Sequence, residues 1–109
     1  MSIFISIASY QDPLLVSTIF SAYNNAEDKD NLVFSICDQS DEGIRVDEMT
    51  FSNQIHYEHV DPLFSKGPCW ARHRAQSFFN EEDFFLQVDS HTQFAPSWDK
   101  IFTEQLEKI

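Results

Sequence analysis

The feature that most constrains the fold is a series of four short segments that are typical of β-strands, separated by segments of helical periodicity or polar loop. These segments are Ile3–Ala8, Asn31–Cys37, Ile55–Val60 and Phe84–Val88. The first is rich in β-branched residues, which favours a central strand buried in a parallel sheet over an alternating surface strand. We therefore predict four strands, with the first strand near the middle of the sheet.

The first predicted helix starts at Asp12-Pro13, because aspartate is a good N-cap and proline fits the first helical position. Its apolar face comprises Leu15, Ile19, Ala22 and Ala26. The spacing of these residues is that of one helix face. The chain thus begins with a strand, a short loop and a helix.

Two further helices are predicted in the second half of the chain. One starts near Pro68 and runs to about Asn80, and its inward-facing residues are expected to be Ala71, Ala75, Phe78 and Phe79. The other is expected to be capped by Ser97 and carries an apolar stripe formed by Trp98, Ile101, Phe102, Leu106 and Ile109.

Strands alternating with helices in units of about 30 residues predict a single α/β domain over residues 1–109, a three-layer α/β/α sandwich with a mostly parallel sheet. Ligands of such sheets bind beyond the carboxyl ends of the strands. The positions of interest are therefore 9–12, 38 and 89–91. The long polar segment 39–54 is either a functional loop or a solvated insertion.

Charge excludes several partners. Eighteen acidic and seven basic residues give a net charge of −11, which would repel nucleic acid and anionic membranes. No apolar run approaches the roughly 18 residues of a membrane span, and the amino terminus lacks the pattern of a signal peptide. We therefore expect a soluble, cytoplasmic protein. With only two glycines, the chain has neither a GxGxxG nor a Walker phosphate loop.

The end of the fourth strand offers a candidate metal site. Asp89 and His91 are two residues apart, and such positions of an extended segment point to the same side. A carboxylate and an imidazole there suit Mn²⁺ or Mg²⁺ held together with phosphate oxygens. A cation so placed would neutralise the charge that develops on a departing diphosphate.

The start of the second predicted helix offers a candidate phosphate site. Gly67-Pro68 leads into a helix that carries Arg72 and Arg74, and a helix N-terminus attracts anions. Arg72 is the predicted phosphate contact. The alternative is that both arginines pair with the surplus carboxylates of the chain.

Cysteine and histidine give weaker signals. Cys37 and Cys69 form no CxxC pair and are interpreted as reduced thiols. Cys69 and His73 are one helical turn apart, but no third residue is present to orient a catalytic thiolate pair. His56 and His59 are three apart on a strand and face opposite sides, so they cannot share a metal ion.

Three separated motifs give a resemblance to a known family. The segments ISIASYQDP, GPCWAR and LQVDSHTQF, followed by Trp98-Asp99, extend from Ile3 to about Asp99. In this order and spacing they resemble the cytoplasmic polypeptide N-acetylglucosaminyltransferases that modify hydroxyproline. The resemblance implies a GT-A fold, a divalent cation and UDP-GlcNAc as the sugar donor.

The resemblance also implies roles for individual residues. Asp89 and His91 would match the Asp-x-His form of the Asp-x-Asp metal motif, and Ser90 would lie by the ribose or phosphate. The remaining donor contacts implied are Ser9, Tyr10 and Asp12 at the uridine, Arg72 near the nucleotide and Asp38 at the uracil. Two departures are Gln11 and Gln93, which stand where arginine would be expected.

Length is a further departure, because a GT-A catalytic domain needs roughly another hundred residues after the metal motif. We therefore expect the amino-terminal, nucleotide-binding half of such a domain. Its expected partners are a UDP-sugar, a hydroxyl acceptor on protein or glycan, and either a second copy of the chain or a missing carboxyl-terminal half. No catalytic residue can be assigned. Alternatives are a non-catalytic nucleotide-binding module and a flavodoxin-like or response-regulator-like domain.

Overall fold

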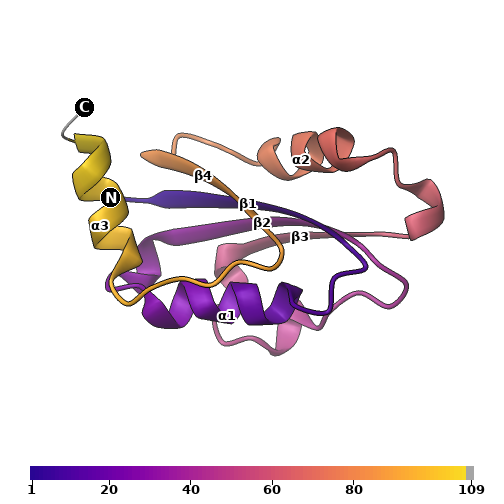
Figure 1. Cartoon of the computed structure of the whole chain (residues 1–109), viewed down its shortest axis with the longest axis horizontal. Coiled ribbons are helices and arrows are strands. Elements are labelled where there is room, and N and C mark those ends of the chain that lie inside the picture. Colours follow the sequence, from indigo (N-terminus) through magenta and orange to yellow (C-terminus); the bar gives the residue numbers. More distant parts are fainter. Residues whose placement is uncertain (108–109) are drawn as a thin grey trace.

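The four predicted strands form one sheet in which all neighbours run parallel (Figure 1). The strands are β1 (Ile3–Tyr10), β2 (Leu32–Gln39), β3 (Ile55–Val60) and β4 (Phe84–Asp89), in the spatial order β3-β2-β1-β4. The computed structural model describes residues 1–107. As predicted, β1 occupies a central position, and β3 and β4 are the two edges.

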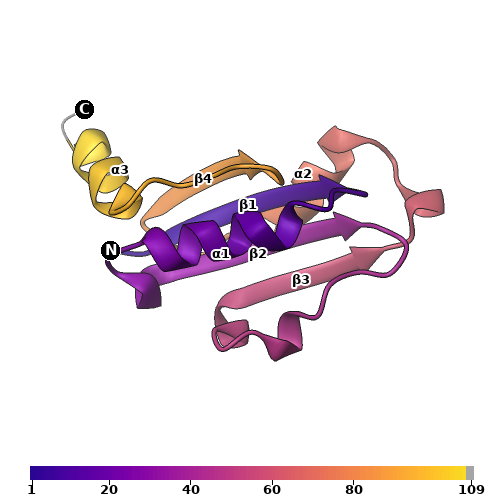
Figure 2. The ribbon, with the colours of Figure 1, turned by 60° about the horizontal axis from the view of Figure 1, so that its bottom comes forward.

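Helices cover both faces of this sheet. They are α1 (Leu15–Asn25), α2 (Pro68–Gln76) and α3 (Trp98–Glu107). Figure 2 shows α1 in front of the strands and α2 behind them, with α3 beside the amino ends of β1 and β4. The α/β/α sandwich predicted from the sequence is confirmed, and it is consistent with part of a GT-A-like domain. No helix within residues 1–107 has the length and apolar character needed to cross a membrane.

The pleat of each strand divides the core into two unequal parts. The larger part lies between the sheet and α1, and it includes Ile3, Ile5, Ile7, Leu15, Ile19, Ala22, Leu32, Phe34, Ile36 and Trp98. Alternate residues of the strands face α2, where Cys37, Ala71 and Ala75 form a smaller cluster. Small side chains let α2 approach closely enough for the Ser35 hydroxyl to donate to the carbonyl of Ala75 at 2.6 Å.

Helix α2 is shorter than predicted. It ends at Gln76 rather than Asn80, because the backbone N–H of Ser77 caps it and the Ser77 hydroxyl bonds the carbonyl of Arg74 at 2.6 Å. The predicted inward orientation of Phe78 and Phe79 is therefore wrong, and both are more than two-fifths exposed. They pack as half-buried rings, Phe78 on His56 at a centroid distance of 4.9 Å and Phe79 edge-on to Phe4 and Phe85.

The predicted cap and stripe of α3 need correction too. Ser97 has a backbone φ of 59° and its N–H donates to the carbonyl of Asn25, so it does not act as a side-chain cap. Trp98 is buried, but Ile101 and Leu106 are exposed, because α3 packs at the end of the sheet and not along its face. Ile109 lies outside the described residues.

A buried carboxylate fastens α3 to the segment between α1 and β2. Asp99 accepts hydrogen bonds from the backbone N–H groups of Glu27 and Asp28, at 2.8 and 2.9 Å. Burial alone raises the pKa of Asp99, but these N–H groups outweigh burial and the net shift is downward. The ionised form is therefore the one that stabilises the fold.

We predict that Asp99→Asn lowers the free energy of unfolding at pH 7 by about 1–3 kcal/mol, since the new amide places N–H groups against N–H groups. Because the folded pKa is lowered, this contribution is present above the unfolded value of about 3.9 and is lost as the pH falls through the folded pKa. Urea unfolding at pH 7 and pH 3 measures it. Glu104→Gln, on the exposed side of the same helix, serves as control. Equal losses for Asp99→Asn at both pH values would contradict the prediction.

Candidate functional site

Two pockets flank the carboxyl edge of the sheet, where the sequence placed its candidate residues. The α2-side pocket has a volume of about 400 Å³ and is lined by Ala8, Ser9, Tyr10, Gln39, Ser65, Gly67, Pro68, Arg72, Gln87, Val88 and Asp89. The α1-side pocket has a volume of about 530 Å³ and its polar lining includes Gln11, Asp12, Asp38, Ser40, Asp41 and Glu42. The predicted site residues are divided between these two pockets and the turn after β4.

Four predicted residues meet in the α2-side pocket, namely Ser9, Tyr10, Arg72 and Asp89. Arg72 comes from α2, and Asp89 is the last residue of β4. Within residues 1–107 neither of these two charged side chains makes a hydrogen bond or an ion pair. Both charges are therefore available to a ligand.

Arg74 differs from Arg72 in this respect. Its Nε donates to Glu58 Oε1 at 2.9 Å, and a second bond joins the same two side chains. The hydrogen bond from Arg74 lowers the pKa of the Glu58 carboxyl. The alternative in which both arginines pair with carboxylates thus holds for Arg74 and not for Arg72.

The wall of the α2-side pocket is fixed by a residue that the sequence analysis did not single out. The buried Gln39 side chain donates through Nε2 to the carbonyl of Ser9 at 2.9 Å, and its Oε1 accepts a hydrogen bond from the Ser65 hydroxyl. Gln39 thereby connects the end of β1 to the loop that leads into α2. The hydroxyl of Ser9 itself, in a residue 1% exposed, has no hydrogen-bond partner among the described residues.

The amino end of α2 contributes the opposite wall. Gly67 has a φ of 99°, a conformation that favours glycine, and Pro68 begins the helix. A helix N-terminus carries partial positive charge, and Arg72 adds a full one. This side of the pocket is thus suited to an anionic group.

The α1-side pocket is acidic, and Asp38 is more buried than a residue beyond the end of a strand would be. The predicted strand ends at Cys37, which would leave Asp38 outside it, but β2 continues to Gln39 and Asp38 is 2% exposed. The strand is longer because Ser9 and Tyr10 of β1 pair with Asp38 and Gln39. The ladder therefore continues through polar residues that the apolar pattern does not include.

Tyr57 holds Asp38 in this position. Its hydroxyl donates to Asp38 Oδ2 at 2.7 Å and accepts from the backbone N–H of Ile44 at 2.9 Å. Burial, and then the hydrogen bond to Asp38, raise the pKa of Tyr57 far above its usual value. Gly43, with a φ of 73°, lies so close that a Cβ there would be 2.9 Å from the Tyr57 hydroxyl. The acidic segment after β2 is therefore fastened to β3.

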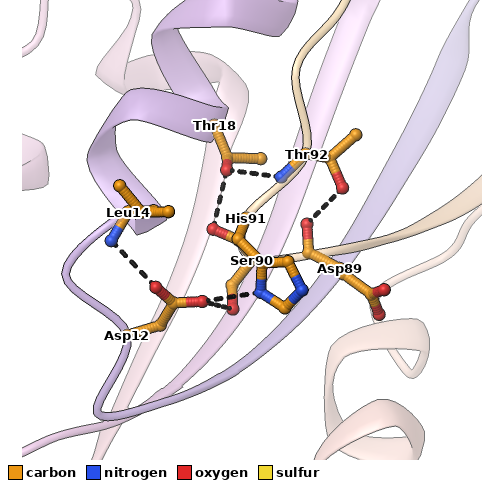
Figure 3. A network of polar contacts seen from close by, with 7 residues as sticks. All are labelled: Asp12, Leu14, Thr18, Asp89, Ser90, His91 and Thr92. Atoms are coloured by element: carbon orange, nitrogen blue, oxygen red, sulfur yellow. Dashed lines mark hydrogen bonds and ion pairs between the residues drawn. The ribbon is translucent and has the colours of Figure 1, made fainter.

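A third group of predicted residues forms a polar network between α1 and the turn after β4 (Figure 3). Asp12 Oδ2 accepts from the Ser90 hydroxyl at 2.6 Å and lies within hydrogen-bond distance of His91 Nδ1, at 3.0 Å. The hydrogen bond from Ser90 is the largest of the contributions that lower the pKa of Asp12. Ser90 is 6% exposed, so its hydroxyl is occupied within the protein.

Asp89 and His91 do not converge on one point. The extended strand ends at Asp89, and the chain then turns, with the Thr92 hydroxyl donating to the Asp89 carbonyl at 2.8 Å. Figure 3 shows the Asp89 carboxylate pointing away from the His91 ring. The turn carries His91 toward Asp12, whereas Asp89 remains in the α2-side pocket.

Throughout residues 1–107, no three side chains of His, Cys, Asp or Glu gather where they could hold a metal ion. Mg²⁺ and similar hard cations are often held by one or two carboxylates, with waters and substrate phosphates supplying the other ligands. Asp89, whose carboxylate is free of protein contacts in the described chain, fits this kind of site. A cation there would depend on the ligand for most of its coordination.

The thiols do not add chemistry to this site. Burial raises the pKa of the Cys37 thiol to about 11, so it is not a thiolate at neutral pH. Cys69 is exposed, and no hydrogen bond connects it to His73 in the described part of the chain. As predicted, His56 and His59 lie on opposite faces, with His56 stacked on Phe78 and His59 Nε2 bonded to the carbonyl of Ser40.

One comparison with known proteins gives a match. A family model described as glycosyltransferase (GlcNAc) matches residues 40–109. The matched span is well over half of the chain and includes Arg72, Asp89 and His91. No curated protein and no solved structure gives a match.

We predict that Tyr57→Phe lowers the free energy of unfolding by about 1–3 kcal/mol, because it leaves a buried carboxylate and a backbone N–H without a partner. Tyr23→Phe is the matched control, since the Tyr23 ring stacks on Phe51 and its hydroxyl makes no hydrogen bond to the described residues. Urea unfolding of both variants tests this. Equal stability of the two variants would show that the Tyr57 hydroxyl does not hold Asp38.

Proposed function

Because this chain belongs to the glycosyltransferase (GlcNAc) family, we propose that it binds a UDP-sugar, UDP-GlcNAc foremost, and transfers the sugar to a hydroxyl acceptor on a protein or glycan. The observation that carries the proposal is the α2-side pocket, in which Ser9, Tyr10, Arg72 and Asp89 meet. A pocket at the carboxyl ends of parallel strands is where α/β folds bind nucleotides.

Each residue of this pocket has a role in the proposal. Arg72 binds the diphosphate, because it is a cationic residue of this pocket and has no ion-pair partner within residues 1–107. Tyr10, which is 59% exposed at the end of β1, offers its ring to the uridine, with Ser9 beside it. These contacts orient the donor and offset the charge that forms on the leaving diphosphate.

Asp89 is the proposed carboxylate ligand of Mn²⁺ or Mg²⁺. The motif implies His91 as a second protein ligand, and because the two side chains do not converge in this structure, His91 would have to turn toward Asp89 to share the cation. A divalent cation shared with the diphosphate supplies Lewis-acid stabilisation of the leaving group. The proposed role of Asp89 is to hold the divalent cation next to Arg72. Asp12, Asp38 and Ser90 lie outside the α2-side pocket in this structure, and their contacts to the donor stay predictions.

The finer parts of the proposal come from the sequence motifs. We place the chain with the hydroxyproline-modifying N-acetylglucosaminyltransferases of GT-A fold, acting in the cytoplasm. Its further partner is then a second copy of the chain or a carboxyl-terminal half. The three motifs in their common order support this placement.

We predict that Arg72→Ala weakens UDP binding by about 10- to 100-fold, corresponding to a loss of about 1.5–3 kcal/mol, and weakens uridine binding far less. The reason is that only UDP carries the diphosphate. Arg74→Ala removes the same charge from the same helix and is the control, because Arg74 is engaged by Glu58. Isothermal titration calorimetry measures both ligands. Equal effects of Arg72→Ala on UDP and uridine would remove Arg72 from the phosphate site.

We predict that Asp89→Asn abolishes the dependence of UDP binding on Mn²⁺ while the thermal midpoint of unfolding changes little, since the carboxylate is exposed and unpaired among residues 1–107. Titrations with Mn²⁺ and with EDTA measure the dependence. Asp30→Asn serves as the control for the loss of one negative charge, because Asp30 lies before the amino end of β2, at the other end of the strands from the pocket. Undiminished Mn²⁺ dependence in Asp89→Asn would contradict its assignment.

Titration of the unaltered chain with UDP and then UDP-GlcNAc tests the proposal as a whole. Mn²⁺-dependent binding, together with release of UDP from UDP-GlcNAc, is the expected result. Tight binding without turnover would favour the non-catalytic nucleotide-binding module. No binding with Mn²⁺ or with EDTA would contradict a donor site in this chain.

A further inference from the structure

Asp12 bonds two segments of the chain at once. Its Oδ1 accepts from the backbone N–H of Leu14 at 2.9 Å, at the start of α1. Its Oδ2 accepts from the Ser90 hydroxyl and is hydrogen-bonded to His91 Nδ1, 78 and 79 residues away in the sequence. The carboxylate therefore connects the loop after β1 to the turn after β4 (Figure 3).

The chain contains an internal comparison for these contacts. Asp61 stands in a second Asp-Pro-Leu segment, directly after β3, whereas one residue separates Asp12 from β1. Its Oδ1 accepts from the N–H of Leu63 at the same 2.9 Å. Within the described chain Asp61 makes no further side-chain hydrogen bond. The local turn thus needs only one carboxylate oxygen, and the bonds of Asp12 Oδ2 to Ser90 and His91 are additional to it.

Helix α1 also fixes the backbone on which His91 stands. The hydroxyl of Thr18, in a residue 1% exposed, donates to the carbonyl of Ser90 at 2.6 Å and accepts from the N–H of Thr92 at 3.1 Å. The residues on both sides of His91 are therefore held from the same helix. With its backbone fixed and Nδ1 bonded to Asp12, the imidazole has a defined orientation.

We propose that Asp12 is a positioning residue that fixes the tautomer of His91. An ionised carboxylate only accepts hydrogen bonds, so in the neutral imidazole the hydrogen must lie on Nδ1. Nε2 then keeps its lone pair, on a side chain that is 61% exposed and whose Nε2 has no partner in residues 1–107. The pair thereby presents a fixed electron-pair donor to solvent at the carboxyl edge of the sheet.

The ligand class that this arrangement suits is a divalent cation of the Mn²⁺ type, and this step rests on the proposed function. Histidines that bind metals commonly donate the other ring N–H to a carboxylate, which fixes the ring and makes the free nitrogen more basic. Asp12 stands in that relation to His91. In this inference Asp12 acts on the cation through His91, and not through the uridine contact that the motif implies.

The test reads the tautomer directly by long-range ¹H–¹⁵N NMR at pH 8, with His91→Gln used to assign the signals. The expected result is an Nδ1–H imidazole at His91. Asp12→Asn should reverse it to Nε2–H, because the Asn oxygen keeps the turn at Leu14 while its amide donates to Nδ1. Asp61→Asn removes the same charge from the matched turn and should leave the tautomer unchanged.

An Nε2–H imidazole at His91 in the unaltered chain would overturn the proposal. This measurement uses the unaltered chain, so it does not depend on whether a variant folds. An unchanged tautomer in a folded Asp12→Asn variant overturns it as well. The tautomer measurement uses no nucleotide, so its result is independent of UDP binding. If the expected tautomers are found but UDP does not bind, the proposed function is contradicted and the role of Asp12 is not.

Titration with Mn²⁺ alone tests the cation step, through paramagnetic broadening of the His91 ring signals. We expect the unaltered chain and Asp61→Asn to bind alike and Asp12→Asn to bind about 10- to 100-fold more weakly. Broadening at His91 that is the same in all three proteins would overturn the link between the tautomer and the cation. Absence of broadening at His91 in the unaltered chain would overturn the cation as the ligand.

Discussion

The parallel register of β1 with its two neighbours is the constraint on which the rest of the structure depends. Ala8 of β1 pairs with Asp89 of β4, and Ser9 pairs with Asp38 of β2. Residues that are about 80 positions apart in the sequence therefore lie together at the carboxyl ends of the strands. Because Ile3, Ile5 and Ile7 of β1 face the core under α1, a slip by one residue would turn these isoleucines away from it.

Because successive residues of a strand point to opposite faces, the polar side chains at the carboxyl ends of the strands are divided between the two faces of the sheet. Tyr10, Gln39 and Asp89 fall on the side of α2, where Arg72 is unpaired within the described chain. Asp38 points the other way and is held by Tyr57. A pocket that contains an arginine and an acidic pocket thus lie on opposite faces of the sheet, and under the proposed function the donor occupies the α2 side.

The sequence was sufficient for features that depend on local pattern. Short segments typical of β-strands located all four strands, and the end of the sheet at which the candidate residues gather followed from parallel pairing. The end of α2 before Phe78 is set locally by the hydrogen bonds of Ser77, which the apolar pattern did not indicate. The turn that separates His91 from Asp89 is held by contacts with Thr18 and Asp12, which are too distant in the sequence for a local pattern to predict. Thr18 was a missed signal, because a threonine between Leu15 and Ile19 on a buried helix face must find a hydrogen-bond partner.

The close approach of Gly43 to Tyr57 also bears on how sequences of this kind can vary. A Cβ at position 43 would lie 2.9 Å from the tyrosine hydroxyl, which is too close, and 3.3 Å from the ring of His59, which is a tight contact. A larger residue there becomes acceptable only if position 57 loses its hydroxyl or the segment moves away from β3. Among relatives these two positions are therefore expected to covary, and their covariation would record a spatial contact rather than a shared part in chemistry.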